Sequence, residues 1–249
     1  MIRTFFVVLL VFAYAFLVGS ICILIALFRG NPNILYRAGR HCISLAMKLA
    51  KVEIDIRGRE HIKAGQNYLF LANHQSYSDP PALVFSIPLD VRLILKKELR
   101  KLPLVGYILQ LGGFVFINRK DRTQAIEAMK QAVRQLKNKE SFLIYPEGTR
   151  TRTGKMGPFK KGPFVLAIES GVPIIPVSVS GSYAIMPPHQ FKITPGKIRI
   201  SFHPSIETEG QTLGKREWLM NRVWKTIASG LTESEYDVKA ILPEKEQDG

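Results

Sequence analysis

The chain has 249 residues, with 35 Lys and Arg against 20 Asp and Glu and a formal net charge of +15. This length suits one large domain or two small ones, and the excess positive charge indicates an acidic partner such as nucleic acid, anionic lipid or a phosphorylated substrate. The two cysteines, Cys22 and Cys42, form neither a Cys-x-x-Cys pair nor a metal-ligand spacing, which argues against a disulfide framework and a zinc site.

The N-terminus is a long apolar segment. Thr4 to Phe28 contains no charged residue. As a helix this segment would rise about 37 Å at about 1.5 Å per residue, enough to cross a hydrocarbon core about 30 Å thick. A signal peptide fits less well, because the run is long, only Arg3 precedes it and no convincing cleavage site follows.

A second helix is predicted from Ile34 to Lys51, where apolar and basic residues alternate as in amphipathic helices at membrane surfaces. Either the first helix spans the bilayer, or the two helices form a hairpin in one leaflet; the short turn at Asn31–Asn33 favours the hairpin. The basic residues after the apolar run place the remaining chain on the cytoplasmic side of the cell membrane. We therefore expect residues 1–51 to form a two-helix membrane anchor and residues 52–249 to form one globular domain.

From Val52 onward, short apolar runs alternate with helical stretches. Runs rich in Ile, Val and Phe and bounded by Gly, Pro or Asn predict strands at 52–56, 68–72, 91–95, 114–117, 142–145, 174–180 and 198–202. Helical spacing of apolar residues predicts helices at 81–85, 105–111, 122–137, 163–169 and 216–231. This alternation predicts an α/β fold with a mixed, mostly parallel sheet of about seven strands flanked by helices on both faces.

Polar residues follow the ends of three predicted strands: His74, Arg119 and the segment Glu147–Arg150. Ligands of open α/β sheets bind outside the carboxyl ends of the strands, so these residues are candidates for a site. In His74–Asp79, a carboxylate five residues after an imidazole can fix the tautomer of the ring, which can then remove a proton from a substrate hydroxyl. A turn-capping Asp beside a solvated His is the alternative.

Three basic or polar segments suit phosphate binding. Arg119 ends an apolar run that begins at a glycine pair, and Arg favours bidentate phosphate contacts. In Tyr145–Arg150 a carboxylate can accept from a substrate hydroxyl, a glycine permits close approach, and Thr and Arg can donate to phosphate. Lys96, in a basic cluster after another predicted strand, is a further candidate for a phosphate ligand. The alternative for Arg119 is a solvated side chain that caps the end of a strand. The alternative for the other two segments is an exposed, solvated loop or helix start without a ligand.

The prolines in Val172–Val177 indicate an edge strand, a bulge or the start of a strand. This segment either lines an acyl channel or packs in the core, and core packing is favoured.

Four segments resemble, in their order and spacing, the glycerolipid acyltransferase family: Asn73–Asp79, Gly113–Arg119, Tyr145–Arg150 and Val172–Val177. Within that family the chain looks most like the bacterial 1-acylglycerol-3-phosphate (lysophosphatidate) acyltransferases. The resemblance extends from about Gly58 to Ser182. Its one departure is Tyr145, where Phe is common in the family.

The resemblance implies a role for each matched residue. His74 would be the general base and Asp79 its orienting carboxylate. The phosphorylated acceptor would be bound by Arg119, Glu147, Gly148, Thr149 and Arg150, with Lys96 as a helper. The implied reaction moves a fatty acyl group from a thioester of acyl carrier protein or coenzyme A to the 2-hydroxyl of lysophosphatidate. It forms phosphatidic acid in phospholipid synthesis, at membrane lipids and without a metal or other cofactor.

Three alternatives stay open from the sequence. The same chemistry could use glycerol 3-phosphate or another lysophospholipid as acceptor. A serine hydrolase could use Ser76 or Ser78, although the Gly-x-Ser-x-Gly elbow is missing. A basic module could bind membrane or nucleic acid without catalysis, although no RNA-binding aromatic motif or helix-turn-helix pattern is present; we expect no nucleic-acid partner.

Overall fold

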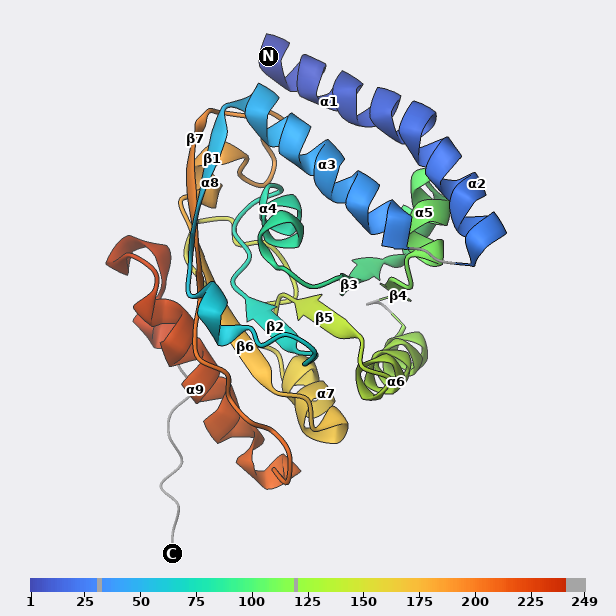
Figure 1. Cartoon of the computed structure of the whole chain (residues 1–249). Coiled ribbons are helices and arrows are strands. Elements are labelled where there is room, and N and C mark those ends of the chain that lie inside the picture. Colours follow the sequence, from blue (N-terminus) through green and yellow to red (C-terminus); the bar gives the residue numbers. More distant parts are fainter. Residues whose placement is uncertain (31–32, 119–120, 241–249) are drawn as a thin grey trace, which may run out of the picture.

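The computed structural model describes residues 1–30, 33–118 and 121–240. Across these residues the strands form one seven-stranded sheet in the order β1-β7-β6-β2-β5-β3-β4 (Figure 1). The strands are β1 (Val52–Arg57), β2 (Leu69–Ala72), β3 (Val91–Lys96), β4 (Val115–Ile117), β5 (Ser141–Ile144), β6 (Ile174–Ser180) and β7 (Gly196–Phe202). Neighbouring strands are parallel except β6 and β7, which are antiparallel. The predicted α/β fold with a mixed, mostly parallel sheet is confirmed.

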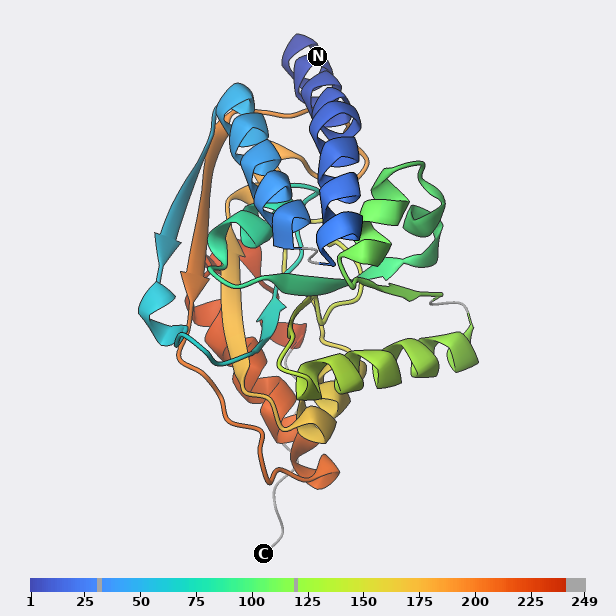
Figure 2. The ribbon, with the colours of Figure 1, turned by 45° about the vertical axis from the view of Figure 1, so that its right-hand side comes forward.

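Helices cover both faces of this sheet (Figures 1 and 2). After the N-terminal helices come α4 (Asp79–Ser86), α5 (Val105–Leu111), α6 (Arg122–Lys137), α7 (Gly162–Ser170), α8 (Ser182–Ile185) and α9 (Arg216–Ser229). Short 3₁₀ helices are η2 (Arg59–His61), η3 (Lys97–Lys101), η4 (Leu213–Lys215), η5 (Glu233–Glu235) and η6 (Val238–Ala240). Side chains of β2 alternate between the faces: Leu69 and Leu71 share a core with α6, α7 and α9, whereas Phe70 shares one with α4.

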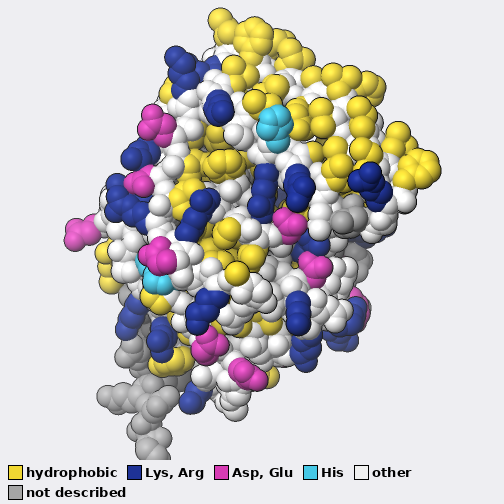
Figure 3. All heavy atoms as spheres, in the orientation of Figure 1, with side chains coloured by type: hydrophobic (Ala, Val, Ile, Leu, Met, Phe, Trp, Pro, Cys, Tyr) yellow, Lys and Arg dark blue, Asp and Glu magenta, His cyan; other side chains and the backbone are white. Residues whose placement is uncertain are grey.

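The N-terminal helices form an antiparallel pair. α1 (Ile2–Tyr14), the π-helical turn η1 (Ala15–Gly19) and α2 (Ser20–Arg29) form one long helix, and α3 (Asn33–Ala50) returns along it (Figure 1). The Tyr14 hydroxyl lies 2.9 Å from Nδ1 of His41 across the pair. The first helix is long and apolar enough to cross a membrane, and it exposes large side chains such as Phe12 and Phe16. Figure 3 shows this apolar surface bordered by basic side chains.

The helix pair packs directly onto the sheet. Only Lys51 separates α3 from β1, and Val7 and Ala50 belong to the same core cluster as Phe70 of β2. Farther along the pair, Cys22 and its neighbours pack against Ile108 of α5. The N-terminal helices and the sheet therefore share one apolar layer.

β6 differs from one expectation for a proline-containing strand, because it is an interior strand between β7 and β2 and not an edge strand. Pro173 precedes β6, as expected for the start of a strand, but Pro176 lies inside it. The antiparallel ladder with β7 begins only at Val177, and the Pro176 carbonyl accepts from the N–H of His203 at 3.0 Å. A proline is tolerated here because it lies just before the ladder that would need its N–H. The apolar residues of 172–177 are buried in the core.

Candidate active site

The carboxyl ends of five parallel strands, β6, β2, β5, β3 and β4, lie at one edge of the sheet. β2, β5, β3 and β4 are parallel neighbours in this order. His74 follows β2, Glu147–Arg150 follow β5, and Lys96 ends β3. The sheet therefore brings these predicted site residues to the same edge. Arg119, which was predicted to bind phosphate, lies outside the described residues.

His74 and Asp79 form a hydrogen-bonded pair. Nδ1 of His74 is 2.8 Å from Oδ2 of Asp79, and the same oxygen accepts from the backbone N–H groups of Gln75 and Ser76, each at 2.7 Å. Asp79 is fully buried, whereas 14% of the His74 side chain is exposed. When Nδ1–H donates to the carboxylate, the neutral ring has its lone pair on Nε2, which is then the nitrogen that can accept a proton.

The local sequence explains the position of this pair. Asp79 is the first residue of α4, and the two prolines after it suit the first turn of a helix. Asn73 fixes the preceding turn to β6: its Nδ2 donates to the carbonyl of Val179 and its Oδ1 accepts from the N–H of Val179, both at 2.8 Å. Asn73 had no predicted role, and only its place directly before His74 in the sequence hinted at one.

Glu147 joins the segment after β5 to the segment after β2. Its Oε1 accepts from the N–H of His74 at 2.7 Å and its Oε2 from the N–H of Gly157 at 2.9 Å. The side chain is buried, and this burial raises the pKa of Glu147 to about 8; the two backbone N–H groups lower it, and Asp79 adds to the rise. Since both oxygens already accept from the backbone, these contacts favour a bracing role over the direct acceptor contact that the resemblance implied.

Arg150 meets the His74 segment through Tyr77. The guanidinium carbon lies 3.6 Å from the centroid of the Tyr77 ring, a cation–π contact that orients the planar group. The backbone is tied at the same place, because the N–H of Thr151 donates to the carbonyl of His74 at 2.9 Å. Tyr77 had no predicted role, because nothing in the local sequence shows that an aromatic ring supports a cation 73 residues farther along.

The remaining predicted phosphate ligands are Thr149 and Gly148, in the segment that follows β5, and Lys96, which ends β3. Thr149 and Lys96 are exposed. Gly148 has a left-handed backbone with φ of 74°, and a Cβ there would lie 3.0 Å from the side chain of Lys160. The predicted need for glycine at this position thus has a geometric cause.

Tyr145 stacks on the imidazole of His74. The ring centroids are 3.8 Å apart and the planes differ by 16°. Burial, with a smaller contribution from Asp79, raises the pKa of the Tyr145 hydroxyl well above its ordinary value, so the hydroxyl stays neutral. This hydroxyl is buried and has no hydrogen-bond partner among the described residues.

The two serines of the His74 segment bond to groups other than His74. Ser76 donates from Oγ to the carbonyl of Met186 at 2.8 Å. Ser78 Oγ lies 2.8 Å from Ser76 Oγ, and it acts as the donor because the Ser76 hydrogen is already engaged. Neither contact activates a serine as a nucleophile, which needs a base within hydrogen-bond reach.

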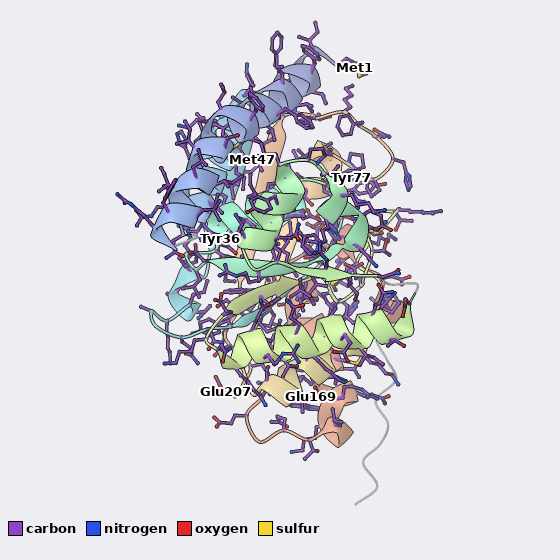
Figure 4. The ribbon with its side chains drawn as sticks, turned by 90° about the vertical axis from the view of Figure 1, so that its right-hand side faces the viewer. Met1, Tyr36, Met47, Tyr77, Glu169 and Glu207 are labelled. Carbon is purple, nitrogen blue, oxygen red and sulfur yellow. The ribbon has the colours of Figure 1, made fainter. Side chains whose placement is uncertain are left out.

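An apolar cavity adjoins this segment. Its volume is about 440 Å³, within the range of about 300–1,000 Å³ for small-molecule sites. Its walls come from the N-terminal helices, the start of α4, α5 and the end of α8, and they include Tyr14, Met47, Tyr77 and Pro81. Figure 4 shows Met47 and Tyr77 in the half of the molecule that holds the N-terminal helices, with Glu169 and Glu207 at the other end. Tyr77 lines the cavity and also belongs to the segment His74–Asp79, so the cavity and this segment adjoin each other.

Fold and site together define an α/β protein with a histidine–carboxylate pair at the carboxyl edge of its sheet, beside an arginine and an apolar cavity. The family model described as Acyltransferase matches residues 53–180, which is half of the chain. The chain belongs to the Acyltransferase family.

Individual relatives agree with this assignment. The 1-acyl-sn-glycerol-3-phosphate acyltransferase of Limnanthes douglasii is 34% identical over 165 residues, which are 66% of this chain and 58% of that protein. The protein of that name from Saccharomyces cerevisiae is 30% identical over 227 residues, or 90% of this chain and 73% of that protein. The crystal structure of a 1-acyl-sn-glycerophosphate acyltransferase from Thermotoga maritima has a TM-score of 0.77 at 26% identity, and the match covers 92% of this chain and 95% of that chain. The chain spans about three fifths of the length of the plant relatives that it matches.

Proposed function

We propose that the protein transfers a fatty acyl group from a thioester of acyl carrier protein or coenzyme A to the 2-hydroxyl of 1-acylglycerol 3-phosphate, forming phosphatidic acid for phospholipid synthesis. The main support is the contact of the Arg150 guanidinium with the ring of Tyr77, because Tyr77 belongs to the segment that holds His74 and Asp79 and also lines the apolar cavity. A base for the hydroxyl, a cation for the phosphate and an apolar space for an acyl chain are what this reaction needs. The printed names of the relatives support the same acceptor.

In this mechanism His74 Nε2 takes the proton of the 2-hydroxyl as the oxygen attacks the thioester carbonyl. The C–O bond of the new ester forms, the C–S bond breaks, and the imidazolium returns its proton to the leaving thiolate. Asp79 fixes the tautomer and stabilises the imidazolium. Such acid–base catalysis contributes about 10²–10⁴ in rate. Arg150 and Lys96 hold the phosphate, Arg119 is a third proposed ligand, and no metal or other cofactor takes part.

The N-terminal helix pair brings this site to the lipid. Residues 1–51 act as the membrane anchor, residues 52–249 act as the catalytic unit, and the site faces the cytoplasmic leaflet of the cell membrane. The apolar surface with its basic border supports this arrangement, because basic side chains beside an apolar helix favour anionic headgroups.

The test uses the purified full chain in lipid with labelled acyl thioesters of both donor types. We expect acyl transfer to lysophosphatidate, a loss of about 10²–10⁴-fold in kcat for His74→Ala and Asp79→Asn, and retained activity for Ser76→Ala and for Ser78→Ala. His61→Ala is a matched histidine control, because η2 precedes β2 and lies at the opposite edge of the sheet. Activity that depends on Ser76 and not on His74 would contradict the mechanism.

The acceptor is tested separately with Arg150→Ala. Removing a phosphate ligand raises KM for lysophosphatidate more than it lowers kcat. Arg222→Ala is the matched control, because Arg222 also lies over an aromatic ring, that of Trp218 on α9. A preference for glycerol 3-phosphate over lysophosphatidate, or salt-sensitive nucleic-acid binding without acyl transfer, would replace the proposal.

A further inference from the structure

The segment after α9 lies against the loop that follows Arg150. Met156 donates from its N–H to the carbonyl of Glu235 at 2.7 Å, and Asp237 donates from its N–H to the carbonyl of Met156 at 3.4 Å. Met156 and Tyr236 thereby form an isolated parallel bridge. We call Thr232–Asp237 the C-terminal clamp, because its backbone is hydrogen-bonded to the loop 151–158 at Met156.

Glu235 fixes this clamp to the edge of the sheet where His74 lies. Its Oε2 accepts from the hydroxyl of Ser180 at 2.6 Å and from both the N–H and the hydroxyl of Thr232, at 3.1 and 3.0 Å. Its Oε1 accepts from the N–H of Gly181 at 2.8 Å. Ser180 is the last residue of β6, which is parallel to β2. One carboxylate therefore joins the clamp to the carboxyl edge of the sheet.

A second contact holds the same loop from α9. Trp224 donates from Nε1 to the carbonyl of Gly157 at 3.2 Å, and its ring meets that of Tyr236 edge-on with centroids 5.7 Å apart. Gly157 is thus fixed through its carbonyl to α9, while its N–H donates to Glu147.

From this loop the hydrogen bonds continue to the proposed general base. Met156 is bonded to the clamp, the next residue Gly157 donates to Glu147, and Glu147 accepts from the N–H of His74. The start of the loop is also tied to His74, through the N–H of Thr151. The backbone that sets the positions of His74 and Arg150 is therefore held, at its far end, by Glu235 and Trp224.

We propose that Glu235 is a positioning residue for acyl transfer: through the C-terminal clamp it holds the loop 151–158 and, by way of Glu147, the backbone of His74. This inference rests on the proposed function. Glu235 acts through other residues and not on the substrate. Such a residue affects the rate because a displacement of about 1 Å in a catalytic group can lower a rate about 10²-fold, and a smaller displacement lowers it less.

The substitution Glu235→Gln tests this role with little change in shape. All four groups that contact the carboxylate are hydrogen-bond donors. In either orientation of its amide, a glutamine points its NH₂ group toward at least one of these donors, so that hydrogen bond is lost. Trp224→Phe loosens the same loop independently, since it removes the N–H that meets Gly157 and keeps a buried ring beside Tyr236. The matched control is Glu233→Gln, an exposed glutamate in the same short helix η5.

Two measurements are made on each variant, both normalised to folded protein. For Glu235→Gln and Trp224→Phe we expect kcat/KM for lysophosphatidate to fall about tenfold. KM should increase because Arg150 is displaced, and kcat should decrease because His74 is displaced. Hydrogen exchange should accelerate at the amides of Gly157 and His74, while the amides of β2 stay protected. Glu233→Gln should match the wild type in both measurements.

The outcomes separate this inference from the proposed function. If the wild type transfers acyl groups and both loop variants keep its kcat/KM per folded molecule, the positioning role is wrong, even if their melting temperatures fall. If the wild type transfers no acyl group, the proposed function is wrong. In that case faster exchange at His74 in Glu235→Gln still supports the clamp as a brace for this backbone, and unchanged exchange refutes it.

Discussion

The imidazole of His74 is held at Nδ1 by the carboxylate of Asp79 and on its face by the stacked ring of Tyr145. The carboxylate decides which nitrogen can accept a proton, and the stacked ring limits how far the imidazole can tilt. A base needs both, because proton transfer depends on direction as well as on tautomer.

Tyr145→Phe should leave this arrangement intact. The variant keeps the stacked ring and removes a buried hydroxyl that has no hydrogen-bond partner among the described residues. We expect kcat within about twofold of the wild type and a free energy of unfolding that is equal or higher by up to about 1 kcal/mol. Tyr145→Leu removes the flat surface, and we expect kcat to fall about tenfold as the imidazole gains freedom. Steady-state kinetics and urea unfolding check both; a severe loss in the Phe variant would show that the hydroxyl has a role.

Glu147 makes stability depend on pH. Its pKa is raised by burial from 4.5 to about 8, so between these values the unfolded chain has released a proton that the folded chain still holds. The unfolded state then binds fewer protons, and the free energy of unfolding falls as the pH rises through this window. The stabilisation is fully present below the lower pKa and is lost as the pH rises through the upper one.

Glu147→Gln should lack this dependence, since an amide does not titrate. Urea unfolding of the wild type and the variant across the same pH series gives the difference between their free energies of unfolding. We expect the wild type to lose stability relative to the variant as the pH rises from 4.5 to 8. Parallel curves would show that Glu147 has its ordinary pKa in the folded chain.

At the scale of elements, local chemistry explains what the sequence predicted well. α6 spans the predicted residues because Asp121 accepts from the N–H of Gln124 as an N-cap and the apolar spacing then continues without a break. The pair of His74 and Asp79 was equally accessible, because both residues lie in one short turn. Strand positions followed from short apolar runs between turn residues, so all seven predicted strands are present.

Contacts between segments that are distant in the sequence could not be predicted from local patterns. The strand order depends on crossovers that leave no local pattern. The Glu147 carboxylate meets a backbone N–H 73 residues away, and backbone donors have no sequence signature. The bridge between Met156 and Tyr236 joins two polar stretches that read as loops. Among the described residues, the sequence therefore predicted that His74, Lys96 and residues 147–150 gather at the edge of the sheet, but not which residues brace them.

The apolar cavity between the N-terminal helices and the sheet should determine the length of the acyl chains that the protein accepts. Ala46 of α3 lines the apolar cavity, and Ala46→Phe would place a ring in this space. We expect the variant to lose activity with long-chain acyl substrates and to keep it with short-chain ones, because only the longer chains need the full depth of the cavity. Ala13→Phe, on the exposed side of α1, is the control. A uniform loss across chain lengths would indicate that this cavity does not hold the acyl chain.

At the scale of the whole molecule, the packing of the N-terminal pair favours the one-leaflet hairpin over a spanning helix. To span a bilayer alone, the first helix would have to leave α3 and give up buried contacts at Val7 and Ile23. α3 cannot follow it at low cost, because Arg40 is paired with Asp90 at 3.3 Å beside the sheet and charged side chains are expensive within a bilayer. A hairpin that lies in the interface keeps all of these contacts.

Binding to vesicles should then depend on both the apolar surface and the net charge of +15. Phe12 and Phe16 are 65% and 70% exposed, and burying each such ring in lipid is worth about 1.5–3 kcal/mol. We expect the double variant Phe12→Glu, Phe16→Glu to bind anionic vesicles at least about 10²-fold more weakly, and wild-type binding to weaken with added salt. Leu213→Glu in η4, beside α9, is an exposed apolar control. Equal binding of all three proteins would place the membrane contact elsewhere.

The position of Met1 decides between the two topologies. In the hairpin, α1 begins at the same side of the bilayer as the sheet, because α3 returns along it to β1. In the spanning arrangement, Met1 lies across the membrane from the sheet. We expect a cleavable tag on Met1 and a second tag at the C-terminus to be equally accessible to protease in sealed vesicles that expose the cytoplasmic face. A protected N-terminal tag beside a cleaved C-terminal one would show that the first helix crosses the bilayer and that its contacts with α3 are broken in the membrane.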